Sequence, residues 1–139
     1  MTLSIRNQLP GTVVEVRPGN VMATVAVRLT GGQHLTAAIT REAVEELGLV
    51  PGTSVKALVK STEVALSTAR VEGLSIRNQL PGTVTRFVLG EAMATVGVSV
   101  AEGELTAAIT KDAAGDLGLF VGSDVIALIK STEVSLATS

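Results

Sequence analysis

The chain has 139 residues, of which 46% are hydrophobic and 17% are charged, and its formal net charge at pH 7 is −2. This hydrophobicity excludes an intrinsically disordered chain, and the weak negative charge argues against a large electrostatic surface for nucleic acid. The sequence has no cysteine, one histidine and only two aromatic residues, both phenylalanine. Disulfides, thiolate metal sites and multi-histidine metal sites within one chain are therefore excluded.

The sequence shows no sign of a membrane or export segment. Its most apolar window, residues 92–101, is about half as long as a membrane-spanning helix. The N-terminal residues lack the charged and apolar regions of a secretion signal. We therefore expect a cytoplasmic protein.

The sequence repeats itself, and the repeat predicts the domain organisation. The segment LSIRNQLPGTV occurs at residues 3–13 and again, unchanged, at 74–84. The segment KSTEV occurs at 60–64 and at 130–134. We predict two small domains of the same fold, residues 1–68 and 74–139, joined by a linker at about residues 69–73.

In chain order, one copy predicts five short strands and one helix. Alternating or β-branched residues predict strands at 12–17, 21–29 and 34–40, the second with one face formed by Val21, Ala23, Val25, Val27 and Leu29. The glycines at 31–32 predict a hairpin turn. Helical spacing then begins after Thr40, a predicted N-cap, and ends at Gly48, a predicted C-cap. Strands at 54–59 and 64–66 follow. This order predicts a mainly β fold with two tandem OB-like five-stranded β-barrels, each with one short α-helix.

Catalysis has little support in the sequence. No pair of carboxylates has the spacing of a general acid and base, no nucleophile has a histidine in both copies, and no glycine-rich phosphate loop occurs. His34 lies at the turn where the second copy is one residue shorter, and we interpret it as a solvated turn residue. We expect no enzyme and no catalytic residue.

Polar residues that both copies retain are more informative. Against sparse charge, the copies keep an arginine and a lysine among hydroxyl side chains; the retained set in the first copy is Ser4, Arg6, Asn7, Gln8, Thr12, Thr24, Thr36, Thr40, Lys60, Ser61, Thr62 and Glu63. Guanidinium, ammonium and hydroxyl groups donate hydrogen bonds and predict an anion site, to which the helix N-terminus near Thr40 would add amide donors. The alternative is that Arg6, Asn7 and Lys60 form salt bridges and turn caps.

Together, these motifs resemble the Mop domain, the molybdate- or tungstate-binding module of the molbindins. The matching motifs, in order, are S-x-R-N-x-L-x-G-T-V, G-x-V-x-A-x-V, A-x-I-T-x-x-A/S, L-G-L-x-x-G and K-S/A-T-x-V. The chain is similar to a tandem, di-Mop molbindin over roughly residues 3–66 and 74–136. The resemblance implies an OB-like barrel and cytoplasmic molybdate or tungstate binding for molybdenum storage or homeostasis.

The resemblance also implies partners and site residues. Six Mop domains assemble, so a tandem chain would form a homotrimer with oxyanions between domains and subunits. No cofactor, nucleic acid or membrane is implied, and no residue would ligate a metal cation directly, because molybdate binds as an oxyanion. The implied oxyanion-binding residues are Ser4, Ile5, Arg6, Thr40, Lys60 and Ser61, then Ser75, Ile76, Arg77, Thr110, Lys130 and Ser131.

The sequence departs from the family pattern at two pairs of positions and leaves two alternatives open. Some relatives have serine where Ala43 and Ala113 stand, and asparagine where Met22 and Met93 stand. One alternative is an oxyanion-sensing regulatory or interaction module that docks on a partner protein. The other is an OB-fold nucleic-acid binder, which the scarcity of aromatic residues and the negative charge disfavour.

Overall fold

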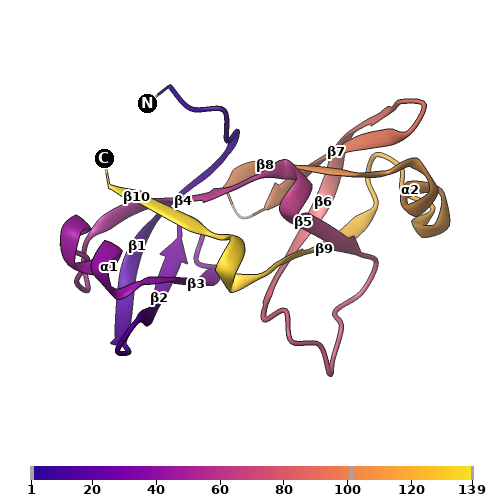
Figure 1. Ribbon diagram of the computed structural model, residues 1–139. Helices are drawn as coiled ribbons and strands as arrows, with labels where there is room; N and C mark the ends of the chain where they lie inside the picture. Colours follow the sequence, from indigo (N-terminus) through magenta and orange to yellow (C-terminus); the bar gives the residue numbers. More distant parts are fainter. Residues whose placement is uncertain (1, 101, 139) are drawn as a thin grey trace.

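Two five-stranded antiparallel sheets, each with one short helix beside it, form the computed structural model, which describes residues 2–100 and 102–138 (Figure 1). The first copy contains β1 (Asn7–Pro18), β2 (Met22–Leu29), β3 (His34–Thr40), α1 (Arg41–Leu47), β4 (Ser54–Val59), the 3-10 turn η1 (Ser61–Glu63) and β5 (Val64–Ser67). The second contains β6 (Asn78–Leu89), β7 (Met93–Val100), β8 (Gly103–Thr110), α2 (Lys111–Leu117), β9 (Asp124–Ile129), η2 (Ser131–Glu133) and β10 (Ser135–Thr138).

The fifth strands of the two copies are exchanged. The strand order is β10-β4-β1-β2-β3 in one sheet and β5-β9-β6-β7-β8 in the other. In Figure 1 the yellow C-terminal strand β10 lies against β4, while β5 lies beside β9. Each sheet therefore takes four strands from one copy and its last strand from the other. Residues 68 and 74 bound the two sequence copies, and their use as domain boundaries stays a prediction.

The predicted fold class is confirmed. The order β-β-β-α-β-β recurs in both copies, and the edge strands of each sheet contact each other, β5 with β8 and β10 with β3, so that each sheet curls towards a barrel. Thr40 caps α1 by accepting a hydrogen bond from the Ala43 N–H, and Gly48 ends the helix with a φ of 63°. A left-handed residue at this position is a common helix terminator.

Two details of the predicted strands are corrected. The predicted strand at 12–17 is longer, because the first half of β1 pairs with β4 and the second half with β2. Val21 does not belong to the inner face of β2; it precedes the strand and is 73% exposed. The other four residues predicted on that face, Ala23, Val25, Val27 and Leu29, are buried.

One continuous hydrophobic core runs through both sheets. It joins Val25, Val27 and Leu35 of the first copy to Val96 and other aliphatic residues of the second copy. Burial of these side chains is the main favourable term in folding. Among the described residues, no helix is long and apolar enough to cross a membrane.

Candidate oxyanion site

The register of the strands places the predicted cations in pairs. Asn7 of β1 pairs with Val59 of β4, so Arg6 and Lys60 are the next residues along those two neighbouring strands. The equivalent pairing of Asn78 with Ile129 places Arg77 beside Lys130 in the second copy. All four cationic residues are exposed.

None of these four cations forms an ion pair within the part of the chain that the structure describes. The ion pairs found there join Arg17 to Glu15 and Arg41 to Glu45. The alternative that Arg6 and Lys60 form salt bridges is therefore wrong for the described residues. Their charges remain available to a ligand or to another subunit.

The asparagine that follows each arginine has a structural role. The Asn7 side chain is 2% exposed; its Nδ2 donates to the carbonyl of Thr106, and its Oδ1 accepts from the Thr106 N–H, both at 2.8 Å. Asn78 forms the same pair of bonds with Thr36, at 2.8 and 2.9 Å. Each asparagine thus binds the third strand of the opposite copy and fixes the backbone next to its arginine.

The lysines and their following serines lie where the strands β4 and β9 end. Lys60 directly precedes η1, whose Glu63 N–H donates to the Lys60 carbonyl at 2.9 Å, and Lys130 precedes η2 in the same way. Ser61 and Ser131 are half-buried. The Ser131 hydroxyl accepts from Asn78 Nδ2 at 3.5 Å, which connects it to the bridge between the copies.

The helix starts supply fewer donors than expected. Thr40 and Thr110 accept hydrogen bonds from the Ala43 and Ala113 amides, at 3.1 Å in both copies. The Arg41 amide donates to the Val21 carbonyl. Two of the first three amides of α1 therefore have partners within the chain, and the contribution of this helix end to anion binding stays a prediction. The threonine O–H groups can still donate.

A pocket of about 450 Å³ brings together three of the predicted residues of the second copy, Ile76, Thr110 and Lys130. Its other wall is Thr62–Ala65 of the first copy, and Met93 also lines it. Thr62 and Glu63 belong to the retained polar set but were not predicted as site residues, because only the exchange of β5 brings them to the second copy. Ser75, Arg77 and Ser131 lie outside this pocket lining.

The charges around this pocket offset each other. Lys130 lines it, but so does Glu63. Burying a dianion requires compensating positive charge. Because Glu63 cancels the charge of Lys130, the pocket of a single chain does not supply enough positive charge. Arg6 lines a separate open depression with Thr2, Leu3 and Gln8. No cluster of three or more His, Asp or Glu side chains among residues 2–100 and 102–138 is placed to hold a metal cation.

Comparisons with known proteins match both copies. Residues 3–66 and 74–136 each match the TOBE domain. The chain is 42% identical over 136 residues to the molybdenum-pterin-binding protein MopB of Rhodobacter capsulatus, covering 96% of this chain and 50% of MopB. It is 44% identical over 66 residues to the molybdenum-pterin-binding protein 2 of Clostridium pasteurianum, covering 48% of this chain and 97% of that protein.

A solved structure matches the whole chain. The crystal structure of the cytoplasmic molybdate-binding protein ModG, with molybdate bound, superposes with a TM-score of 0.96 at 38% identity and covers 100% of both chains. The chain spans about half the length of MopB and of the other curated two-copy matches. The fold and the tandem arrangement are thus shared with a structure that holds molybdate.

Proposed function

The chain belongs to the TOBE domain family, and on this premise we propose that it binds molybdate, or tungstate, as an oxyanion. The predicted resemblance to tandem molybdate-binding domains is confirmed by the match of both copies and by the full-length likeness to ModG. The observation that carries the proposal is the matched placement of Arg6 with Lys60 and Arg77 with Lys130. These cations are exposed, and no described acidic side chain pairs with them.

Hydrogen-bond chemistry supports molybdate over phosphate. Molybdate near neutral pH is a tetrahedral dianion with four acceptor oxygens and no proton to donate. Arginine, lysine, hydroxyl and backbone N–H groups can all donate to it. Hydrogen phosphate would place its own O–H against another donor, and one unpaired buried polar group costs about 1–3 kcal/mol. Sulfate is also an all-acceptor dianion, so it must be rejected by size.

We assign the binding to the twelve residues that the family motif carries, six in each copy, within an assembly. In this pocket the negative charge of Glu63 offsets the positive charge of Lys130. A dianion therefore needs further positive charge, which supports a site that a second subunit completes. Large apolar side chains that one chain leaves exposed, among them Val21, Val50 and Phe120, support burial between subunits. The assembly implied by the family is a homotrimer of six domains. Its role would be molybdenum storage or homeostasis in the cytoplasm, as a binding protein rather than an enzyme.

Equilibrium dialysis against molybdate, with sulfate and phosphate in excess and molybdenum counted by elemental analysis, tests the proposal. The unaltered protein should retain molybdate. Arg6→Gln with Arg77→Gln, and separately Lys60→Met with Lys130→Met, should weaken retention about tenfold or more, because each removes charge-assisted hydrogen bonds. Arg70→Gln with Lys111→Met removes two other exposed cations and should bind like the unaltered protein.

Two results would overturn the proposal. One is a failure of the folded, unaltered protein to retain molybdate at micromolar concentration. The other is an equal loss of molybdate retention in the Arg70 and Lys111 control. Retention would then depend on the overall charge of the protein and not on the position of the cations.

A further inference from the structure

Three neighbouring strands of the first copy present two rows of side chains on one outer face. Thr12 of β1 pairs with Arg28 of β2 on one side and with Ser54 of β4 on the other. Two residues along, Pro10 pairs with Lys56 and receives a hydrogen bond from the Thr30 N–H at 3.0 Å. Directly opposed residues, and residues two apart, share a face of a sheet. The intervening row points inward, with Leu29 and Val55 buried.

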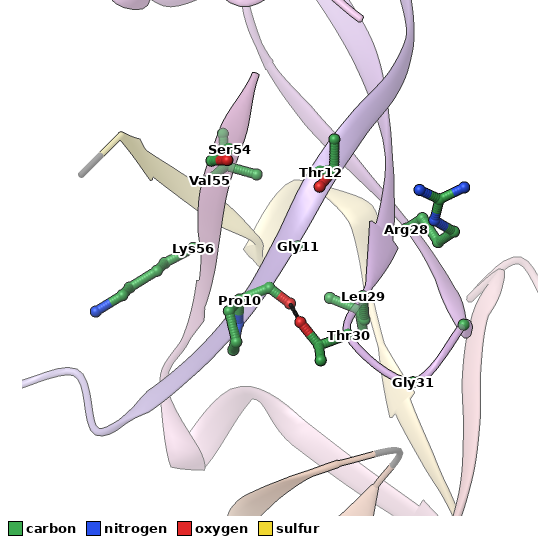
Figure 2. Close-up of a pocket in the computed structure, with 11 residues that line it drawn as sticks. Pro10, Gly11, Thr12, Arg28, Leu29, Thr30, Gly31, Ser54, Val55 and Lys56 are labelled. Atoms are coloured by element: carbon green, nitrogen blue, oxygen red, sulfur yellow. Dashed lines mark hydrogen bonds between the residues drawn. The ribbon is translucent and has the colours of Figure 1, made fainter. Parts of the chain in front are cut away.

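These two rows surround an open depression of about 470 Å³. Figure 2 shows Arg28 and Lys56 extending to opposite corners, with the Thr12 and Ser54 hydroxyls along one side and Gly11 between the rows. Gly11 is required where β1 and β2 approach closely, since a Cβ there would lie 2.7 Å from the Arg28 carbonyl oxygen. Gly11 belongs to the inward row, so its missing Cβ lets β1 and β2 approach closely beneath the depression.

The donors around the depression have no acceptor within the described chain. None of the hydrogen bonds or ion pairs found among residues 2–100 and 102–138 engages the side chains of Arg28, Lys56, Thr12 or Ser54. The Thr30 hydroxyl is the exception, because it donates to the Pro10 carbonyl at 3.3 Å (Figure 2). Two cations and two hydroxyls are thus free to bind an external acceptor.

The second copy provides an internal comparison, because the same rows carry the opposite charge there. Ser99 stands opposite Thr83 where Arg28 stands opposite Thr12. Asp124 and Ile126 replace Ser54 and Lys56. The Thr83 hydroxyl lies 3.5 Å from Asp124 Oδ1, so this donor is satisfied within the chain.

The next strand continues this contrast. His34 pairs with Arg28 in the first copy, whereas Glu104 pairs with Ser99 in the second. The two cationic side chains on this face therefore belong to the first copy alone, and the shared fold does not require them.

We propose that this face of the first copy is a second anion site, which takes an elongated polyanion of the phosphate-chain class. Arg28 and Lys56 are two strands and two residues apart, which places their Cα atoms about 12 Å from each other. A compact oxyanion would have to draw both long side chains inward at a cost in side-chain entropy. A phosphate chain offers one anionic group to each cation and acceptor oxygens to the hydroxyls between them.

This site is separate from the proposed molybdate site. Arg6 and Lys60 lie four residues further along β1 and β4 than Pro10 and Lys56, which is about 13 Å along the strands. Neither phenylalanine lines the depression, so the lining offers no aromatic ring on which a nucleobase would stack. The phosphate chain itself is the expected ligand.

Isothermal titration with tripolyphosphate, ATP and orthophosphate, at fixed ionic strength and with molybdate saturating, tests the proposal. Tripolyphosphate should bind the intact protein at least about tenfold more tightly than orthophosphate. Equal affinities for tripolyphosphate and ATP would support a free phosphate chain as ligand. Tighter binding of ATP would support a chain carried by a nucleoside.

Two double variants test whether Arg28 and Lys56 form the binding site. Arg28→Ser with Lys56→Ile gives the first copy the residues that the second copy already has at those positions, so the fold should accept them. It should weaken tripolyphosphate binding about tenfold or more and leave molybdate retention unchanged. Arg28→Gln with Lys56→Gln keeps a polar, unbranched stem at both positions while removing the charges, and should show the same loss.

The charge-matched control is Arg70→Ser with Lys111→Ala, which should bind tripolyphosphate like the intact protein. The proposal is overturned if tripolyphosphate binds no better than orthophosphate. It is also overturned if both Arg28 and Lys56 double variants bind tripolyphosphate normally, or if the control loses as much affinity as they do.

Discussion

At the scale of single residues, the buried asparagines explain why both copies keep an Arg-Asn pair. Arg6 and Asn7 are neighbours, yet one is exposed and the other is 2% exposed. The carboxamide of Asn7 offers one acceptor and one donor to the backbone of Thr106, as a neighbouring strand would. Buried backbone groups need such partners. The asparagine therefore takes the place of a strand where the two copies meet.

Replacing Asn7 should destabilise the whole molecule. Asn7→Leu keeps the branched shape of the side chain but leaves the Thr106 N–H and carbonyl without their partner. We expect the free energy of unfolding to fall by about 2–4 kcal/mol, since each unsatisfied buried group costs about 1–3 kcal/mol. Urea unfolding followed by circular dichroism measures this loss, and Asn78→Leu should behave alike.

The matched control is Asn20→Leu at an exposed turn position, where the change in stability should be small. A comparable loss at Asn20, or no loss at Asn7, would mean that the bridges between the copies contribute little to stability.

The sequence identified which polar residues are important, but it did not predict which residues they contact. Repetition singled out Asn7 together with Arg6 and Lys60, but the partner of Asn7 lies 99 residues away. No local pattern indicates such a partner. Thr62 and Glu63 were retained as well, and their position in the pocket of the other copy follows only from the tertiary pairing of β5.

At the scale of elements, the exchange of the fifth strands was not predictable from local pattern. The strands that accept them are nearly alike, V-K-A-L-V at 55–59 and V-I-A-L-I at 125–129. Both fifth strands follow the same K-S-T-E sequence. Either fifth strand fits either edge in periodicity and side-chain type. Only the path of the chain through η1 and η2 decides which edge each one meets.

Shortening the chain before β10 should therefore affect the other copy. Removal of residues 135–139 deprives β4 of its partner, because Leu136 pairs with Ala57 and Thr138 with Val55. The β4 amides that face β10 should exchange faster with solvent by hydrogen-exchange mass spectrometry. The β9 amides, which pair with β5, should keep their protection and serve as the internal control.

The opposite pattern, with β9 losing protection and β4 keeping it, would mean that each copy completes its own sheet.

Val21 shows that alternation of apolar residues alone does not predict where a strand begins. The apolar spacing continues back from Ala23 to Val21, but the Val21 carbonyl accepts the Arg41 amide at the start of α1. The chain turns at that point, and β2 begins at Met22. In contrast, strand count, the helix and its caps were predictable, because spacing and capping residues are local signals.

At the scale of the whole molecule, the two copies are joined by a shared core and by contacts in both directions. Most of their buried aliphatic residues belong to a single core. Two exchanged strands and two asparagine bridges also cross between the copies. A segment that contains one copy has unpaired strand edges, and exposed edges favour pairing with another chain. A second copy can pair with these edges whether it belongs to the same chain or to another chain.

Residues 1–73 expressed alone should therefore associate rather than fold as a monomer. Without β10, the edge of β4 is free, and without β9, β5 has no partner. Two such segments can supply β5 to each other and rebuild both sheets, at the cost of making stability depend on concentration. Sedimentation equilibrium with circular dichroism should show dimers or larger assemblies, and dilution should lower the midpoint of thermal unfolding. A folded monomer whose unfolding midpoint ignores concentration would show instead that one copy can complete its own sheet. The exchange would then be a consequence of the tandem linkage, because joined copies hold each other's fifth strand at high effective concentration.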